Sequence, residues 1–277
     1  MITIENLSFA YKKKPVFNGL NLEFTPGHVY GLLGKNGTGK SSLLKNIAGL
    51  LRPKGGNIKV NGCTPFERLP VFLGDVFLVP EEFHLPYISI QDFITYHASF
   101  YPHFSQERFN NYISVFETPV DSTLQNMSYG QKKKVLISFA LATGARVLLM
   151  DEPTNGLDII SKSQFRKILA QALDEERCVI ISTHQVKDLE NLIDRITIID
   201  EGKILFDEDI ETITRKLSFR YSYGDDELAT ALYSESLLKG NLIVAPNEGN
   251  DESNLDLELL YKAIVISGDK ITKLFQS

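Results

Sequence analysis

The sequence predicts an α/β fold with a mainly parallel core sheet, and three observations lead to that class. A buried apolar strand, VYGLL, runs through a glycine-rich turn into a helical segment. The apolar runs VLLM, CVIIS and RITIID then alternate with helical segments such as FRKILAQAL and VKDLENLI, an order typical of parallel strands covered by helices. At the N-terminus, two period-two runs, ITIENLSFAY and VFNGLNLEF, flank a basic turn and predict an antiparallel hairpin.

Composition places the chain among globular proteins with a sizeable core. It has 277 residues, 43% of them hydrophobic, and a formal net charge of −6, so one large domain with a smaller appended module is expected. The negative charge argues against broad binding to the phosphate backbone, and no nucleic-acid partner is expected. Cys63 and Cys178 lack metal-type spacing, so they indicate neither a disulfide framework nor a zinc site, and both are expected to be reduced and buried.

No segment predicts a membrane span or a secretory signal. The longest apolar run, from Val135 to Met150, is interrupted by polar and glycine residues and is shorter than a bilayer requires. The N-terminus, MITIENLSFAY, alternates like a strand and has neither a basic start nor a long apolar stretch, unlike a signal peptide. A cytoplasmic location is therefore expected.

The pattern becomes helical between about Phe83 and Phe116. Ser89 and Asp92 have the spacing of a capping box, ahead of a helix expected to carry Phe93, Tyr96 and Phe100. A second helix is expected to carry Phe109, Tyr112, Ile113 and Phe116. The dense aromatic residues of 83–116 either form a small core or leave a groove for a short helix of a membrane protein.

The last third of the chain divides into two parts. Ile196 to Phe206 predicts a hairpin turning at Glu201-Gly202. Clear periodicity then fades, and a polar loop, APNEGNDESN, precedes the final apolar segment. Residues 1–215 are therefore expected to form the main domain, and residues 216–277 a small appended module.

A phosphate-binding loop links the first buried strand to its helix. The segment consists of Gly34, Lys35, Asn36, Gly37, Thr38, Gly39, Lys40 and Ser41, and Ser42 follows it. Its glycines let backbone N–H groups converge on phosphate oxygens, and the helix adds the positive end of its dipole. Lys40 would reach the β- and γ-phosphates, and the Ser41 hydroxyl would ligate Mg²⁺. A plain glycine turn is the alternative, but the position between strand and helix favours the nucleotide.

The run VLLMDEPTNGLD supplies the acidic residues that nucleotide hydrolysis needs. Val147 to Met150 predict a central strand, which would deliver Asp151 and Glu152 at its carboxyl end, where open α/β sheets bind ligands. Asp151 would hold Mg²⁺ through water. Glu152 would orient or deprotonate the attacking water. An acidic turn without a function is the alternative.

With these residues in place, the chain resembles the ATPase subunit of an ABC transporter over residues 1–215. The resemblance implies a P-loop NTPase fold of the ABC-ATPase type, with an N-terminal antiparallel β subdomain and an inserted helical subdomain at about 83–135. The family's LSGGQ motif contacts ATP bound to the opposite subunit, and here it reads MSYGQ, residues 127–131. It matches at Ser128, Gly130 and Gln131, and departs at Tyr129, where glycine is usual.

Four further residues acquire roles from this resemblance. Tyr11 resembles the aromatic residue that stacks on adenine, with a surface tyrosine as the alternative. His184 resembles the histidine that senses the γ-phosphate, with a structural histidine as the alternative. Asp158 resembles the residue that couples the two active sites of a dimer. Glu81 stands where the family has a glutamine that touches Mg²⁺ and the membrane partner, and a carboxylate can still bind Mg²⁺.

Lys132, Lys133 and Lys134 stand near the start of the helix that the MSYGQ segment opens. Cations in the first turn of a helix oppose its dipole and cost about 0.3–1 kcal/mol each when exposed. An ATP phosphate docked from a second subunit against Ser128 and Gly130 would reverse that effect. The alternative is that the lysines form a solvated or partner-facing patch, as charge runs commonly do.

The expected function is ATP hydrolysis that drives transport through a separate transmembrane permease, with export as the direction. Two copies, most simply a homodimer, would sandwich two ATP molecules, and the chain would lie at the inner face of the cell membrane through its partner. A soluble ABC-type ATPase in assembly or regulation, such as an iron–sulfur assembly ATPase, is the main alternative. A module that clamps ATP without turnover is disfavoured because Glu152 and His184 are both present.

Overall fold

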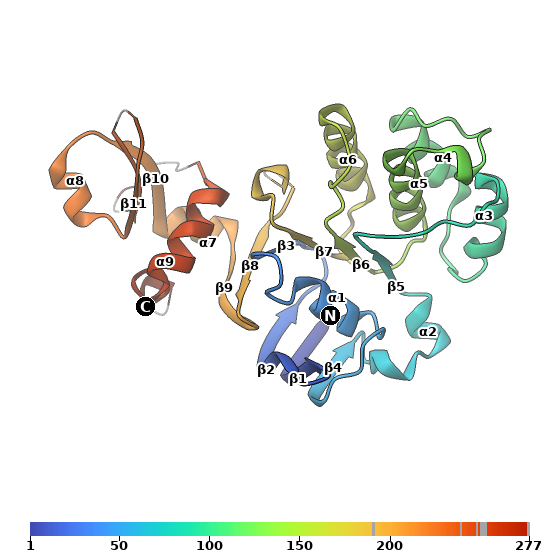
Figure 1. The fold of residues 1–277 in the computed structure, drawn as a ribbon, viewed down its shortest axis with the longest axis horizontal. Coiled ribbons are helices and arrows are strands. Elements are labelled where there is room, and N and C mark those ends of the chain that lie inside the picture. Colours follow the sequence, from blue (N-terminus) through green and yellow to red (C-terminus); the bar gives the residue numbers. More distant parts are fainter. Residues whose placement is uncertain (190–191, 239, 248, 250–253, 276–277) are drawn as a thin grey trace.

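The computed structural model describes residues 1–189, 192–238, 240–247, 249 and 254–275. In Figure 1 a central sheet lies between an N-terminal sheet below it, a group of helices on one side, and the C-terminal elements on the other. No helix within the described ranges combines the length and the apolar composition that crossing a bilayer requires.

The N-terminal sheet contains the predicted hairpin. It consists of β1 (Ile2–Tyr11), β2 (Lys14–Phe24) and β4 (Gly55–Val60) in the order β2-β1-β4, with antiparallel pairing throughout. Ile2 and Ile4, and then Leu7 and Phe9, are buried with a period of two on either side of a register shift between Ile4 and Leu7, as a strand with one face on a core requires. The hairpin prediction is confirmed.

The central sheet has six strands in the order β5-β6-β7-β3-β8-β9. These are β5 (Val76–Val79), β6 (Val147–Asp151), β7 (Cys178–Thr183), β3 (Val29–Leu33), β8 (Arg195–Asp200) and β9 (Lys203–Asp209). Every pair is parallel except β8 with β9, which forms the hairpin expected at Glu201-Gly202. The mainly parallel α/β sheet is therefore confirmed.

Two hydrophobic cores cover the two faces of this sheet. Val147 and Leu149 of β6 pack into a core with the N-terminal sheet and α1 (Lys40–Ile47). Leu148 and Met150, one residue on in each case, pack into the other core, with α6 (Ile159–Ala172) and the helical group. The period of two thus explains why the whole strand is apolar.

The helical group comprises α3 (Ile90–Ala98), α4 (Gln106–Val115) and α5 (Tyr129–Ala142). Ser89 caps α3 by accepting the Asp92 N–H, but the Asp92 carboxylate accepts from the Ser89 hydroxyl, so the expected capping box is only half formed. Helix α3 ends at Ala98, before Phe100, so the expected aromatic face does not continue. The aromatic residues of 83–116 consequently divide: Phe93, Phe109, Tyr112 and Phe116 are buried, whereas Tyr87, Tyr96 and Phe100 are exposed.

Two smaller expectations need correction. The segment VKDLENLI does not form the expected helix, because its described residues show only a 3₁₀ turn, η3 (Val186–Leu189), and residues 190 and 191 lie outside the described part. Cys178 is buried, which raises the pKa of its thiol to about 12, whereas Cys63 is only half-buried. Short helical turns, η1 (Pro65–Glu67), α2 (Pro70–Leu73) and η2 (Leu124–Asn126), complete the connections.

After α7 (Ile210–Lys216), the chain forms a third sheet, antiparallel and in the order β10-β12-β11. Its strands are β10 (Leu217–Ser222), β11 (Tyr233–Ser236) and β12 (Asn241–Pro246), and α8 (Asp225–Thr230) joins β10 to β11. Because β12 includes Ala245 and Pro246, the expected polar loop begins later, and its residues 248 and 250–253 lie outside the described part. The final helix, α9 (Leu257–Phe275), buries Leu260, Ala263 and Ile264 in the core that also holds Phe206 of β9.

Candidate functional site

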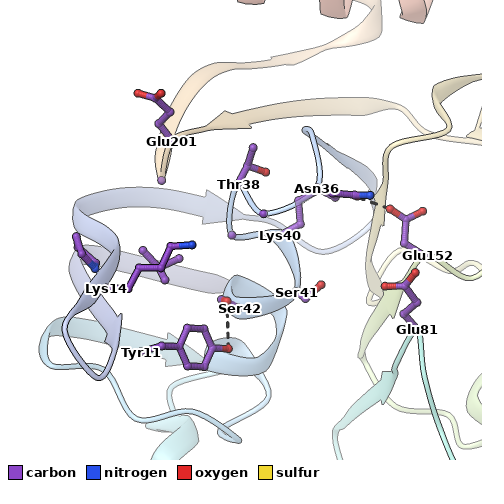
Figure 2. A pocket seen from close by; sticks show the side chains of 15 residues that line it. Tyr11, Lys14, Asn36, Thr38, Lys40, Ser41, Ser42, Glu81, Glu152 and Glu201 are labelled. Atoms are coloured by element: carbon purple, nitrogen blue, oxygen red, sulfur yellow. Dashed lines mark hydrogen bonds and ion pairs between the residues drawn. The ribbon is translucent and has the colours of Figure 1, made fainter.

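A cavity of about 530 Å³ opens beside the phosphate loop. Figure 2 shows side chains from several elements converging on it: the loop and α1, the end of β1, and the segments that follow β5 and β6. Its lining residues include Tyr11, Asn36, Gly37, Thr38, Gly39, Lys40, Ser41, Ser42, Glu81 and Glu152. Four separate parts of the sequence-predicted site therefore meet in one space: Tyr11, the phosphate loop with the start of α1, Glu81 and Glu152.

The phosphate loop is held tightly between β3 and α1. A Cβ on Gly34 would lie 2.5 Å from the Ile199 carbonyl oxygen, so only glycine fits there. The Thr38 hydroxyl donates to the Lys35 carbonyl at 2.9 Å and stabilises the turn. Helix α1 begins at Lys40 after Gly39, with no side chain capping its first turn. Its free N–H groups are thus available to an anion.

Lys40 is buried and points back onto the loop. Its Nζ donates to the Gly34 carbonyl at 2.6 Å and to the Lys35 carbonyl at 3.2 Å, and it lies 4.0 Å from Glu152 Oε1. Burial lowers the pKa of Lys40, and the nearby carboxylates of Glu152, Asp151 and Glu81 oppose that shift. The two hydrogen-bond partners of the ammonium group are neutral carbonyls, which a charged phosphate could replace.

Glu152 is fixed at the carboxyl end of β6, with only 3% of its surface exposed. Its Oε1 accepts from the His184 backbone N–H at 2.9 Å and contacts His184 Nδ1 at 2.7 Å, and its Oε2 accepts from the Thr183 hydroxyl at 2.9 Å. The backbone of Glu152 has a φ of 46°, a conformation that costs energy in a residue with a side chain. The structure thus brings Glu152 and His184 into direct contact, and the local backbone aims the carboxylate at Lys40.

The proposed magnesium ligands are oxygen donors around the same cavity. Ser41 and Glu81 line it, and Asp151 lies buried beside Glu152, where it accepts from the Ser182 hydroxyl at 2.5 Å. Within the described residues there is no cluster of three acidic, histidine or cysteine side chains that could hold a metal unaided. Mg²⁺ typically takes one or two carboxylates together with substrate phosphates and water. The donor set here fits that mode of binding.

Tyr11 lies at the rim of the cavity, at the end of β1. Its hydroxyl receives a hydrogen bond from the Ser42 hydroxyl at 3.3 Å, drawn in Figure 2, and its ring meets Phe9 edge to face at 4.9 Å. The side chain remains 46% exposed. An aromatic face is thus presented next to the phosphate loop, as stacking on a base would require.

Eight predicted site residues are not among those lining this cavity. Four of them contact or directly precede residues that do line it: Gly34, Lys35, Asp151 and His184. The other four belong to the starts of α5 and α6: Ser128, Gly130, Gln131 and Asp158. Ser128 is exposed and begins α5 with a complete capping box, since its hydroxyl accepts the Gln131 N–H and Gln131 Oε1 accepts the Ser128 N–H. Asp158 is exposed at the start of α6, where the Ser161 N–H donates to it at 2.7 Å and lowers its pKa. Both positions face outward from the chain that carries them.

The lysine run of α5 departs from expectation. Because α5 begins at Tyr129, only Lys132 belongs to its first turn, and Lys133 and Lys134 lie beyond it. Lys133 is fully buried, and its Nζ donates to the carbonyls of Glu152 at 2.7 Å and Asn155 at 3.1 Å. Lys134 is half-buried and donates to the Phe116 carbonyl. The interpretation of the run as a solvated patch is therefore wrong for Lys133, which instead supports the segment that carries Glu152.

Replacing Lys133 by methionine is expected to remove a pH dependence of stability. Burial lowers the pKa of Lys133 to about 8, whereas lysine in an unfolded chain titrates near 10.4. Between about pH 8 and 10 the unfolded chain holds the proton that the folded chain has released, so the Lys133 contribution to the free energy of unfolding rises with pH. Urea unfolding at pH 7.5 and 9.5 should therefore show the wild type gaining stability relative to K133M. If wild type and K133M differed in free energy of unfolding by the same amount at both pH values, this prediction would be contradicted. K132M, which removes the neighbouring lysine, is the control.

Sequence reasoning missed several residues that complete the site. Thr183 fixes Glu152, and Asn155 joins the segments after β5, β6 and β7 through its side chain, with Glu81 and Gln185 as partners. Tyr261 of α9 reaches the back of the phosphate loop, where it lines a second cavity of about 70 Å³ with Gly34, Lys35, Thr183, His184 and others. The sequence shows that Asn155 lies in the NGLD turn and that Thr183 ends a strand. It does not show their contacts with Glu81, Gln185 and Glu152, because these partners are distant in the chain.

Comparison with known proteins gives a consistent result. Residues 17–155 match the family model described as ABC transporter. The cobalt import ATP-binding protein CbiO of Salmonella typhi is 34% identical over 218 residues, covering 74% of this chain and 79% of that protein. The lantibiotic transport ATP-binding protein SrtF of Streptococcus pyogenes is 29% identical over 217 residues, covering 76% of this chain and 92% of that protein.

A solved structure supports the fold. The cbiO1 protein of Clostridium perfringens, part of the ABC transporter complex cbiONQ, superposes with a TM-score of 0.63 at 24% identity, covering 76% of this chain and 89% of that one. The predicted fold of the ABC-ATPase type is thereby confirmed. The phosphate loop and the strand that carries Asp151 and Glu152 both lie within the span matched by the family model.

Proposed function

This chain belongs to the ABC transporter family of ATP-binding subunits, and on that premise we propose that it pairs with a second copy around two ATP molecules and drives export through a separate transmembrane permease. Subunits of this family bind and hydrolyse ATP to power transport, and this chain is such an ATPase. The observation that carries the proposal is the Glu152 carboxylate, aimed at Lys40 across the cavity at 4.0 Å.

The phosphate loop would bind the triphosphate through its own backbone. The N–H groups of the loop and of the first turn of α1 would donate to phosphate oxygens, and the Lys40 ammonium would move from the Gly34 carbonyl to the β- and γ-phosphates. Tyr11 would stack on the adenine. Bound Mg²⁺ would neutralise charge on the phosphates, with Ser41, Asp151 and Glu81 as the oxygen donors that hold it.

Glu152 would act as the general base. Its carboxylate accepts hydrogen bonds from Thr183 and from the His184 backbone N–H, which hold it in one orientation beside the γ-phosphate position. A fixed carboxylate within reach of a water can take its proton as the water attacks phosphorus. The His184 ring contacts Glu152 through Nδ1. When ATP is bound, it would turn to contact the γ-phosphate instead.

The second half of each site would come from the other copy. Ser128, Gly130, Gln131 and Asp158 lie away from the cavity of their own chain, with Ser128 and Asp158 exposed at the starts of α5 and α6. Hydrogen-bond donors at the start of a helix suit a phosphate. In a two-fold symmetric dimer, each copy would present these groups to the ATP held by its partner.

The proposed transport is export through a separate membrane protein. One relative is named for cobalt import and another for lantibiotic transport, and cbiO1 is part of a larger transporter complex. We assign residues 1–215 to the ATPase domain and residues 216–277 to an appended module, and we place the chain at the inner membrane face through its partner. Vesicles that contain the permease should show ATP-dependent movement of substrate out of the compartment that holds the ATPase. Turnover that no membrane protein alters would favour the soluble assembly ATPase.

Composite sites predict complementation between two inactive variants. Lys40→Met removes triphosphate binding, and Ser128→Asp keeps a helix-capping side chain while placing a negative charge against the partner's phosphate. Each variant alone should be inactive. An equal mixture should recover about a quarter of the wild-type activity, because random pairing makes about half of the dimers mixed and each mixed dimer has one complete site.

The mixture distinguishes this arrangement from a self-sufficient subunit. If each chain hydrolysed ATP alone, Ser128→Asp would stay active by itself and mixing would add nothing. The control is a mixture of the Lys40→Met variant with a Lys40→Met, Ser128→Asp double variant, in which no dimer has a complete site. ATP turnover at equal total protein concentration is the measurement.

A further inference from the structure

The two departures of this chain from the ABC pattern, Tyr129 and Glu81, touch each other. The Tyr129 hydroxyl donates to the Glu81 carbonyl oxygen at 2.5 Å. The Tyr129 ring also stacks on Phe83, with centroids 5.1 Å apart and planes 27° apart. A glycine at position 129 could make neither contact. The start of α5 is therefore attached to the segment after β5, which reaches the ATP cavity at Glu81.

Asn155 extends this attachment to the segment after β6. Its Nδ2 donates to Glu81 Oε1 at 3.1 Å, and its Oδ1 accepts from Gln185 Nε2 at 3.2 Å. Its backbone carbonyl accepts from Lys133 Nζ at 3.1 Å. One asparagine thus joins three segments that surround the cavity to helix α5.

Lys133 completes the attachment from inside α5. Its buried ammonium donates to the Glu152 carbonyl at 2.7 Å and lies 5.8 Å from the centre of the Tyr129 ring. The ring of Tyr129 also packs on the backbone at Gly156, where an added Cβ would lie 3.0 Å from Tyr129 Cδ1. A shift of the first turns of α5 would therefore displace the backbone of Glu152 and the segment that carries Glu81.

We infer that Tyr129, Glu81, Asn155 and Lys133 form a clamp by which the start of α5, where the partner's ATP would dock, positions Glu81 and Glu152 at the ATP of its own chain. The inference rests on the proposed dimer. In this arrangement Tyr129 is a positioning residue. It affects hydrolysis of the ATP bound to the phosphate loop of its own chain, whereas Ser128 of the same chain contacts the ATP bound to the partner. The usual glycine of the family offers no such bond, so the clamp is a property of this sequence.

The alternative is that Tyr129 serves only the ATP that docks beside it on the partner. The two roles can be separated in the mixed dimer of the Lys40→Met and Ser128→Asp variants, which has one complete site. That site takes its phosphate loop and Glu152 from the Ser128→Asp chain, and its Ser128 from the Lys40→Met chain. Tyr129→Phe, which removes the hydroxyl and keeps the ring, can then be placed in either chain.

The clamp predicts that Tyr129→Phe lowers turnover when it is placed in the Ser128→Asp chain. Loss of one hydrogen bond leads to an expected decrease of about fivefold in kcat, with little change in KM. Tyr129→Gly in the same chain should lower kcat further, because it also removes the ring. Tyr96→Phe, at another exposed tyrosine of the helical group, is the matched control and should leave turnover at the level of the parent mixture.

The outcomes are distinct. An effect of Tyr129→Phe only in the Lys40→Met chain would overturn the clamp and support a direct contact with the partner's ATP. No effect in either chain would overturn it as well. If the parent mixture itself showed no turnover, the composite dimer would be at fault rather than the clamp. Unfolding midpoints of the Tyr129→Phe and Tyr96→Phe variants, expected within about 2 °C of the parent because each substitution removes only a hydroxyl at a partly exposed site, show that the change is not a loss of folding.

Discussion

Replacing Glu152 by glutamine is expected to lower ATP turnover by a factor of about 10³, the middle of the range for loss of a general base. Glutamine has nearly the same shape, so its oxygen can still accept from the His184 N–H, and the Thr183 hydroxyl can rotate to accept from the new amide. The fold and the cavity should therefore persist, and only the proton acceptor is lost. ATP should still bind, because the carboxylate that faces the triphosphate no longer repels it.

The same variant should reveal the dimer. When hydrolysis stops, ATP and Mg²⁺ remain in the paired sites, and size-exclusion chromatography should show a species of twice the mass that disappears without nucleotide. Glu201→Gln, which removes another carboxylate at the rim of the cavity, is the control and should change turnover far less. A Glu152→Gln protein that remained monomeric with ATP and still hydrolysed it would contradict the assignment of Glu152 and of the dimer together.

The parts of this molecule that could be predicted from the sequence are those that local physics determines. The phosphate loop, the apolar strand before Asp151 and Glu152, and the turn at Glu201-Gly202 all depend on residues that are adjacent in the chain. Each of them requires particular residues within a short stretch, such as a glycine where two segments approach closely or a run of apolar residues in a buried strand, and such stretches can be recognised in the sequence. The structure accordingly places Lys40 and Glu152 together at one edge of the sheet.

The parts that could not be predicted depend on which surfaces meet. Lys133 looks like one charge of a solvated run, yet it is buried because the second turn of α5 faces the carbonyls of Glu152 and Asn155. Tyr129 and Glu81 are 48 residues apart, and neither residue type suggests the other. Tyr261 meets the phosphate loop only because α9 packs across β9. No period or motif encodes such pairings.

The turn between β8 and β9 offers a second large effect, on stability. Glu201 and Gly202 have φ values of 45° and 73°, as the two central residues of a type I′ turn require. A Cβ on Gly202 would lie 1.8 Å from the carbonyl oxygen of Val16 in β2, so alanine there forces the turn away from β2. Gly202→Ala should lower the free energy of unfolding by about 2–4 kcal/mol, from the positive φ and from overpacking together.

Gly62→Ala isolates the clash from the backbone strain. Gly62 has a φ of 80°, and no heavy atom lies within 4 Å of an added Cβ, so its replacement should cost only about 1 kcal/mol. Thermal unfolding should therefore place Gly202→Ala several degrees below Gly62→Ala, at roughly 2–4 °C per kcal/mol. Because Val16, Glu201 and Gly202 line the ATP cavity, Gly202→Ala should also weaken ATP binding, whereas Gly62→Ala should not. Equal unfolding midpoints for the two variants would contradict the prediction, because they would show that a Cβ at position 202 does not clash with β2.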